Sequence, residues 1–318
     1  MANQNEMVKE RADRKIKISS FVPFFGLAIV LVLFASISGG KLFLSDNWPV
    51  LLSNIYSIGL GCAGVLFLMA TGNMDFSLPG IISASGAIAA IASGGTNAAV
   101  VLPVTLGCAT GMGFLNGFLF GKLKIPSFIT TLGTLFIWSG TSTLVTKGYL
   151  SIPLELNEFD NMPLKVGVLI GVFIITYIIF EYTPFGKQCR AIGSSCEAAR
   201  QSGVNVQRVN ILTFTISGLL CGVIAFFLII RANTAAATTG QGLNFSVLLA
   251  MMLGGVSLNG GWIVKFRSVV VGSLLMALVA NGLTLTGLNG FDQQWIEAIL
   301  FIVVVAVSMN RKTGVIVR

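Results

Sequence analysis

Apolar blocks separated by short polar stretches run the length of the chain. There are ten of them, at residues 21–38, 50–71, 79–95, 98–121, 127–146, 164–181, 210–230, 243–259, 268–288 and 294–310. A helix needs about 20 apolar residues to cross a bilayer, and each block is close to that length. A helix also satisfies its own backbone hydrogen bonds, as a span in lipid must. The pattern therefore predicts an all-α integral membrane protein with about ten transmembrane helices.

The polar stretch between the sixth and seventh blocks predicts a short helix of its own. Ser194 is a good N-cap residue, Glu197 three positions later completes a capping box, and Gly203 is a typical stop. Only about two turns lie between these signals, so the helix is marginal alone in water. Ala198 and Ala199 give it a small, flat surface. It needs a neighbour, which is either another part of this chain or a separate soluble protein.

Charge is scarce in this chain and is unevenly placed. The composition is 54% hydrophobic and 10% charged, whereas about a quarter of the residues in a soluble domain are charged. With ten spans, 16 of the 20 Lys and Arg residues fall on the side of the N-terminus. Basic residues concentrate in cytoplasmic loops, so both termini and the loop 182–210 are predicted to be cytoplasmic. This distribution accounts for the net charge of +8 without a nucleic-acid partner.

We predict one transmembrane domain, residues 21–310, between cytoplasmic tails at 1–20 and 311–318. A basic tail before an apolar block is also typical of a signal peptide, and Ser36 and Ser38 form a weak cleavage motif. An uncleaved first span is favoured, because the block is long and more spans follow it.

The residue types of common catalytic and metal sites are missing. The chain has no histidine, and its five cysteines are scattered without CxxC spacing. We therefore expect no catalytic residue, no disulfide framework and no bound metal. It also has no GxxxxGK[ST] phosphate-binding loop. If ATP drives this protein, the nucleotide is used by a partner and not bound here.

Glycines in the fourth block recur at helical spacing. Gly113, Gly117 and Gly121 form a small-xxx-small ladder, which lets two helices approach closely. Packing within the monomer is the favoured interpretation, and a contact between two copies stays open.

Asp75 is the outstanding charge between apolar blocks. An ionisable group at membrane depth normally faces a cavity or a partner; the alternative is a wet cytoplasmic turn in which Asp75 caps the next helix. Uncharged polar residues surround it, which suits a neutral, hydroxyl-rich solute better than an ion. The predicted solute pathway comprises Asn54, Asn73, Asp75, Phe76, Ser77, Thr130 and Thr131.

Four stretches, in the same order along the chain, resemble the permeases of ribose-type ABC sugar importers. Residues 190–206 are similar to the family's coupling segment. Residues 72–80 resemble its "GGIDLSVG" run, 126–134 its "PPFIATLGT" run, and 253–261 its "VLGGTSLxGG" run. The resemblance covers about residues 50–310 and includes the larger group with branched-chain amino acid permeases.

This resemblance implies a type II ABC importer fold in the bacterial cytoplasmic membrane. Two permease subunits, alike or different, would pair with two ATPase subunits and an extracytoplasmic solute-binding protein, and the cargo would be a neutral monosaccharide. The residues implied to couple to the ATPase are Ser194, Glu197, Ala198, Ala199, Arg200, Gln201, Ser202 and Gly203.

Other functions remain open at this point. The same machine could carry a nucleoside, a furanosyl signal molecule or a branched-chain amino acid. A self-contained secondary transporter using Asp75 and a membrane enzyme are less favoured. The chain departs from the family pattern at Asn73 and Pro79, at 262–267, and at Ser195 and Cys196. The first two departures are predicted to lie near the cargo or gate, and the third beside the docking helix.

Overall fold

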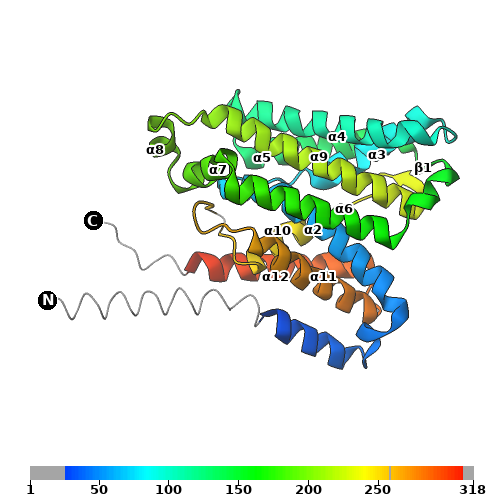
Figure 1. Cartoon of the computed structure of the whole chain (residues 1–318). Helices are drawn as coiled ribbons and strands as arrows, with labels where there is room; N and C mark the ends of the chain where they lie inside the picture. Colours follow the sequence, from blue (N-terminus) through cyan, green and yellow to red (C-terminus); the bar gives the residue numbers. More distant parts are fainter. Residues whose placement is uncertain (1–25, 258, 311–318) are drawn as a thin grey trace.

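The computed structural model describes residues 26–257 and 259–310, which form a bundle of helices (Figure 1). A helix lies on each predicted apolar block. These helices are Gly26–Ile37, α2 (Trp48–Ala70), α3 (Leu78–Ser93), α4 (Ala98–Gly121), α5 (Ser127–Thr146), α6 (Met162–Tyr177), α9 (Val206–Ala232), α10 (Leu243–Leu253), α11 (Arg267–Leu285) and α12 (Gly290–Asn310). The all-α prediction is confirmed. The tails predicted at 1–20 and 311–318 lie outside the described residues.

Short elements occupy the connections. They are the 3-10 turns η1 (Lys41–Phe43), η2 (Ser45–Asn47) and η3 (Leu154–Phe159), the π-helical turn η4 (Ile178–Tyr182), the helices α7 (Pro184–Ser194) and α8 (Cys196–Gln201), and the strands β1 (Tyr149–Ser151) and β2 (Thr234–Ala236). The two strands pair antiparallel, with Leu150 opposite Ala235. This ribbon marks one end of the bundle, here called the ribbon end. Helix α8 marks the opposite end, here called the α8 end (Figure 1).

Six described helices are long and apolar enough to cross a membrane: residues 45–70, α4, α5, α6 with its π-helical turn, α9 and α11. Three further apolar helices, Gly26–Ile37, α3 and α10, are shorter. Glycines in the left-handed conformation explain two of these early ends, because Gly94 caps α3 at φ +56° and Gly255 follows α10 at φ +94°. A multi-span membrane protein is therefore confirmed, whereas ten crossings stays a prediction.

The spanning helices divide into an inner and an outer set. In the apolar windows of α2, α9 and α11, 72%, 72% and 78% of the residues are buried, against 28%, 22% and 22% for α4, α5 and α6. The outer helices turn large apolar side chains outward, among them Phe136, Leu144 and Ile175. Only a lipid environment or another apolar protein surface solvates such faces.

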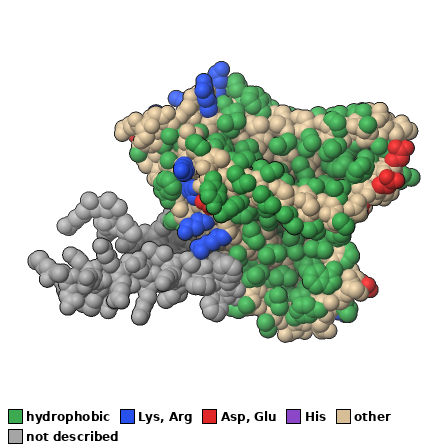
Figure 2. Space-filling model, viewed as in Figure 1, with side chains coloured by type: hydrophobic (Ala, Val, Ile, Leu, Met, Phe, Trp, Pro, Cys, Tyr) green, Lys and Arg blue, Asp and Glu red, His purple; other side chains and the backbone are tan. Residues whose placement is uncertain are grey.

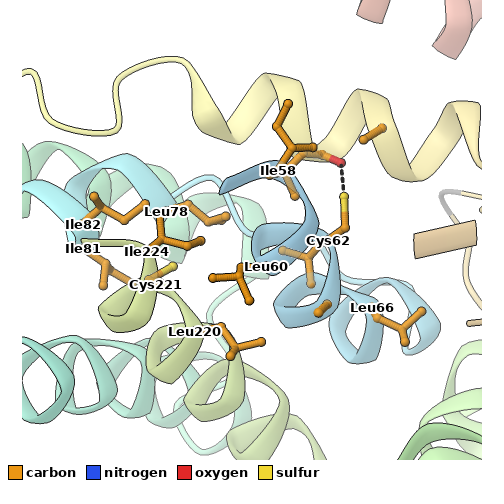
Figure 3. Packing of buried hydrophobic residues seen from close by; sticks show 14 of the residues in the cluster. Ile58, Leu60, Cys62, Leu66, Leu78, Ile81, Ile82, Leu220, Cys221 and Ile224 are labelled. Atoms are coloured by element: carbon orange, nitrogen blue, oxygen red, sulfur yellow. Dashed lines mark hydrogen bonds between the residues drawn. The ribbon is translucent and has the colours of Figure 1, made fainter. Parts of the chain in front are cut away.

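Helix α2 is the centre of the core. Leu60 and Leu66 of α2 are fully buried in one cluster with Ile81 of α3 and Ile224 of α9, as Figure 3 shows. The Sγ of Cys62 lies 3.8 Å from the carbonyl oxygen of Val247 in α10, its acceptor. The core therefore joins helices from both halves of the chain.

The glycine ladder of α4 packs against α9. A Cβ at Gly113 would lie 2.5 Å from the carbonyl oxygen of Phe214, and one at Gly117 would lie 2.8 Å from Ile211 Cα. Gly121 faces the same helix, and Gly218 of α9 meets Gly113 from the other side. Packing within the monomer is confirmed, and Gly218 is a partner that the sequence reading did not identify.

Charges of opposite sign gather at opposite ends of the face shown in Figure 2. Lys and Arg lie towards the α8 end, and Asp and Glu lie towards the ribbon end, where η3 carries Glu155 and Glu158. Since positive charge stays on the cytoplasmic side, this distribution predicts that the α8 end faces the cytoplasm. The orientation predicted from the 16 basic residues rests on the same rule and stays a prediction.

Candidate functional site

The short helix in the polar stretch exists, but its N-cap is one residue later than predicted. Ser195 is the cap, and its Oγ accepts a hydrogen bond from the backbone N–H of Ala198 at 3.3 Å. Ser194 instead ends α7 and donates to the carbonyl oxygen of Arg190 at 3.0 Å. Glu197 therefore stands in the second helical position and cannot complete a capping box; it pairs with Arg200 at 3.4 Å. Both adjacent serines are suitable N-cap residues, but the first of them, Ser194, is the last residue of α7.

The predicted stop at Gly203 is confirmed. Gly203 has φ +83° and donates to the carbonyl oxygen of Arg200 at 3.0 Å, and Val204 donates to that of Ala199 at 3.0 Å. These two bonds form a Schellman motif. Among the coupling residues only Ala199 is buried, at 4% exposure. The helix therefore rests on its own chain through Ala199 and presents its other side chains to solvent.

Helix α7, which the sequence reading missed, fastens α8 to the bundle. Arg190 of α7 pairs with Glu181 at 2.8 Å and donates to the carbonyl oxygen of Phe180 at 3.0 Å. Its guanidinium also lies over the rings of Phe180, at 4.7 Å, and Trp262, at 5.4 Å. Glu181 in turn accepts from the backbone N–H of Phe266 at 3.1 Å. One buried arginine thus links α7, η4 and the loop before α11.

A glycine contact completes this fastening. A Cβ at Gly193 would lie 2.0 Å from the carbonyl oxygen of Ala70 and 2.5 Å from the backbone nitrogen of Gly261. The N–H of Gly261 donates to the same Ala70 carbonyl at 2.9 Å. The ends of α2 and α7 therefore meet the loop after α10 backbone to backbone.

The four motif stretches, far apart in sequence, are linked by direct contacts. The backbone oxygen of Asn259 would lie 3.1 Å from a Cβ at Gly72, which joins the first and last motifs. The rings of Phe76 and Phe128 meet edge to face, with centroids 5.4 Å apart. With Gly193 against Gly261, each motif touches another. Trp262 lies over Arg190 at the α8 end, and its predicted place near the cargo or gate stays a prediction.

Asp75 is buried inside the bundle, so the wet-turn alternative is wrong. Its exposure is 1%, and its carboxylate accepts from the backbone N–H and hydroxyl of Ser77, at 2.9 and 2.5 Å, and from the Ser217 hydroxyl at 3.0 Å. Asn116 donates to the Ser77 hydroxyl at 2.8 Å. This cluster joins the α2–α3 connection to α4 and α9. The described cavities do not include Asp75 among their lining residues.

The other predicted pathway residues have separate positions. Asn73 is half-buried and donates to Thr71 at 2.9 Å. Thr130 and Thr131 are buried, and each hydroxyl donates to a backbone carbonyl at or just before the start of its own helix. Asn54 lines a cavity at the ribbon end.

Three adjoining cavities open at the ribbon end, and Thr238 lines all of them. The largest, of about 670 Å³, reaches Pro79 at the start of α3 and has Phe245 and Trp295 in its wall. The second, of about 310 Å³, is lined by the more polar residues Asn54, Ser53, Ser57, Arg231, Ser246, Gln293 and Glu297. The third, of about 460 Å³, shares Arg231 with the second. The predicted place of Pro79 near the cargo stays a prediction.

Glu297 and Arg231 are site residues that the sequence reading missed. Glu297 is 5% exposed in α12 and accepts from the Ser246 hydroxyl at 2.6 Å. The signal was present, because Glu297 is an acidic residue inside the last apolar block, just as Asp75 lies between two blocks. Arg231 is one of the four basic residues that the charge pattern places on the side opposite the N-terminus, and that pattern gives no sign of a cavity. Among the described residues no group of three or more His, Cys, Asp or Glu side chains could hold a metal ion.

Comparison with known proteins gives one family and several relatives. The family model described as the permease component of the branched-chain amino acid transport system matches residues 50–308. The ribose import permease of Bacillus subtilis is 32% identical over 307 residues, covering 91% of this chain and 92% of its own. The fructose import permease of Rhizobium meliloti is 28% identical over 310 residues, covering 91% and 84%.

A third relative agrees with these two. The L-arabinose transport system permease of Escherichia coli is 32% identical over 261 residues, covering 78% of this chain and 77% of its own. No solved structure matches the chain.

Proposed function

The chain belongs to the family of permease components of the branched-chain amino acid transport system, and on this premise we propose that it imports a neutral monosaccharide. The observation that supports a monosaccharide as the cargo is the set of relatives. Relatives matched over most of the chain include permeases named for ribose, fructose and arabinose. The permease is a multi-pass protein of the bacterial cytoplasmic membrane in this proposal.

ATP hydrolysis belongs to separate subunits in this proposal. The exposed face of α8, carried on a tightly held α7, suits docking into a soluble ATPase, because a short helix needs a neighbour to be stable. Closure of two ATPase subunits on ATP would move α8 and α7 together. The bundle would then switch the ribbon-end cavities between outward and inward access, as rigid-body rocking does in other transporters.

The remaining partners follow from the same proposal. A second permease subunit would cover part of the outer apolar faces, and an extracytoplasmic binding protein would deliver the sugar at the ribbon end. The predicted absence of a bound cofactor is part of this scheme, with ATP used only by the partner.

One observation favours a second cargo. The family description names branched-chain amino acids, and Arg231 and Glu297 line one cavity, as the two ends of a zwitterion would require. The sugar relatives outweigh this, because their matches extend over nearly the whole chain.

The test is purification from the native membrane followed by reconstitution. We expect a stoichiometric soluble protein with a Walker A motif to co-purify and to be lost when α8 is altered. Proteoliposomes holding the full complex and its binding protein should accumulate a monosaccharide only with ATP inside. Uptake by the chain alone under an ion gradient would refute the proposal.

A further inference from the structure

Two charged side chains face the second cavity, and neither has a counter-ion among the residues that the structure describes. Arg231 donates to the hydroxyl of Ser53, and Glu297 accepts from that of Ser246. None of the ion pairs between described residues involves Arg231 or Glu297. Glu297 is buried, and a buried charge in a membrane bundle is costly unless a cavity or a partner stabilises it. Two opposite charges on one cavity, not paired with each other, therefore suit a polar guest that touches both.

The neighbouring wall is of a different kind. Gln241 and Gln294 line both the second cavity and the largest one. Beyond them, the largest cavity is bounded by the rings of Phe136, Phe245 and Trp295. A sugar ring has hydroxyl groups around its edge and C–H groups on its faces. Charged and amide side chains bind such an edge, and an aromatic ring packs against such a face.

Resting on the proposed function, we infer that these adjoining walls form a cargo subsite that selects an uncharged, hydroxyl-rich ring. Glu297 accepts hydrogen bonds from sugar hydroxyls, Arg231 donates to another oxygen, and Trp295 supplies the stacking face. The two amides of Gln241 and Gln294 lie between these groups and bind the remaining hydroxyls.

Selection against charge follows from the pairing of opposite signs. The site as a whole carries no net charge, so a uronic acid is repelled by Glu297 and an amino sugar by Arg231, and neither gains enough from the other group. Removing one charge leaves the opposite charge uncompensated and reverses the preference. A merely structural role for either side chain would not produce opposite changes in two variants.

The experiment is calorimetric titration of the purified permease in detergent, which leaves out the selectivity of the binding protein. The probes are ribose, arabinose, glucuronate, glucosamine and leucine, tested on the wild type, Glu297→Gln, Arg231→Gln and Trp295→Ala. Glu158→Gln and Lys147→Gln are the controls, because both residues are exposed and line none of the three cavities.

We expect Glu297→Gln to bind the neutral sugar about tenfold more weakly, since it loses a charge-assisted hydrogen bond. The same variant should gain affinity for glucuronate, and Arg231→Gln should gain affinity for glucosamine. Trp295→Ala, whose side chain is exposed, should lose neutral-sugar binding without a change in melting temperature.

Parallel losses for all probes, or affinities equal to those of the controls, would overturn the inference. So would leucine binding that exceeds sugar binding and disappears in both charge variants, which would identify a zwitterion site. These results leave the proposed function intact if the reconstituted complex still imports a monosaccharide with ATP. Failure of that uptake would count against the proposed function itself.

Discussion

The two ends of the bundle are built on opposite principles. At the α8 end, backbones of three segments touch at Gly193, Gly261 and Ala70, and a buried Arg190 finds its carboxylate. At the ribbon end, cavities separate the helices, and Arg231 and Glu297 line one of them unpaired. A close-packed region moves as a unit, whereas a region with cavities can change the space between its walls. The α8 end is therefore suited to receiving a push, and the ribbon end to changing its shape around a solute.

The largest expected effect is on stability, when one methyl group is added at the α8 end and, for comparison, one at the ribbon end. Gly193→Ala should lower the free energy of unfolding by about 3 kcal/mol, because the new Cβ meets backbone atoms that cannot rotate away. Gly290→Ala at the ribbon end is the matched control, since a Cβ there meets nothing within 4 Å. Melting temperatures of the two purified variants in detergent give the comparison. Equal melting temperatures would show that the two ends are packed alike.

A smaller difference is expected between the two arginines. Arg190→Gln should cost about 2 kcal/mol of stability, since it leaves the Glu181 carboxylate without its partner in a partly buried site. Arg231→Gln should leave the melting temperature within about 1 °C, because Arg231 forms no ion pair with another described residue. Thermal unfolding followed by circular dichroism measures both. A larger loss for Arg231→Gln would mean that the ribbon end depends on an internal ion pair.

Glu197→Lys should change coupling and leave stability nearly unchanged. Both partners of the Glu197–Arg200 pair are mostly exposed, at 68% and 62%, so the pair contributes little to folding. At a docking surface the inverted charge should lower ATP-dependent uptake by about tenfold. Uptake and ATPase activity are measured in proteoliposomes, with Glu158→Lys at the ribbon end as the control. Full uptake by Glu197→Lys would remove α8 from the coupling scheme.

The smallest expected effect is a difference in maleimide labelling between two cysteines on adjacent helices. Cys196 of α8 is exposed, whereas Cys189 of α7 is buried and burial raises its pKa to about 12. At pH 7.5, about one unit below the pKa of a free thiol, a maleimide should therefore label Cys196 and spare Cys189. Mass spectrometry of a variant retaining only these two cysteines gives the ratio. Added ATPase subunits should protect Cys196, and similar labelling of both thiols would show that α7 is not held against the bundle.

The sequence predicted the helices well, because burial in lipid forces apolar blocks into helices whatever their neighbours are. It also predicted the ladder at Gly117, because two helices that pack closely need small residues at helical spacing, and that spacing is visible in the sequence. It missed α7, because the polar residues 184–194 have the composition of a loop. Their helix is held by a contact with another segment, the ion pair between Arg190 and Glu181. It placed the cap at Ser194 instead of Ser195, because two neighbouring serines give the same local signal. Such choices depend on contacts distant in sequence.

The cavity residues were the hardest part to predict. Asp75 stood out in the sequence, yet its carboxylate is satisfied by Ser77 and Ser217 inside the bundle. Glu297 lies within an apolar block, and the charge pattern places Arg231 only on the side of the membrane opposite the N-terminus. Whether a charge faces protein or an open space depends on the packing of α9, α10 and α12. The sequence shows which residues are charged, but it does not show which of them line a cavity.

The contact between Gly193 and Gly261 also sets an order of events during synthesis. Ala70 and Gly193 are synthesised before the loop that carries Gly261, which follows only after α9 and α10 have been made. Until then the carbonyl oxygen of Ala70 lacks the N–H of Gly261 as its donor, and Gly193 lacks the Gly261 backbone that it packs against. The platform beneath α8 is thus finished only when most of the membrane domain has been inserted.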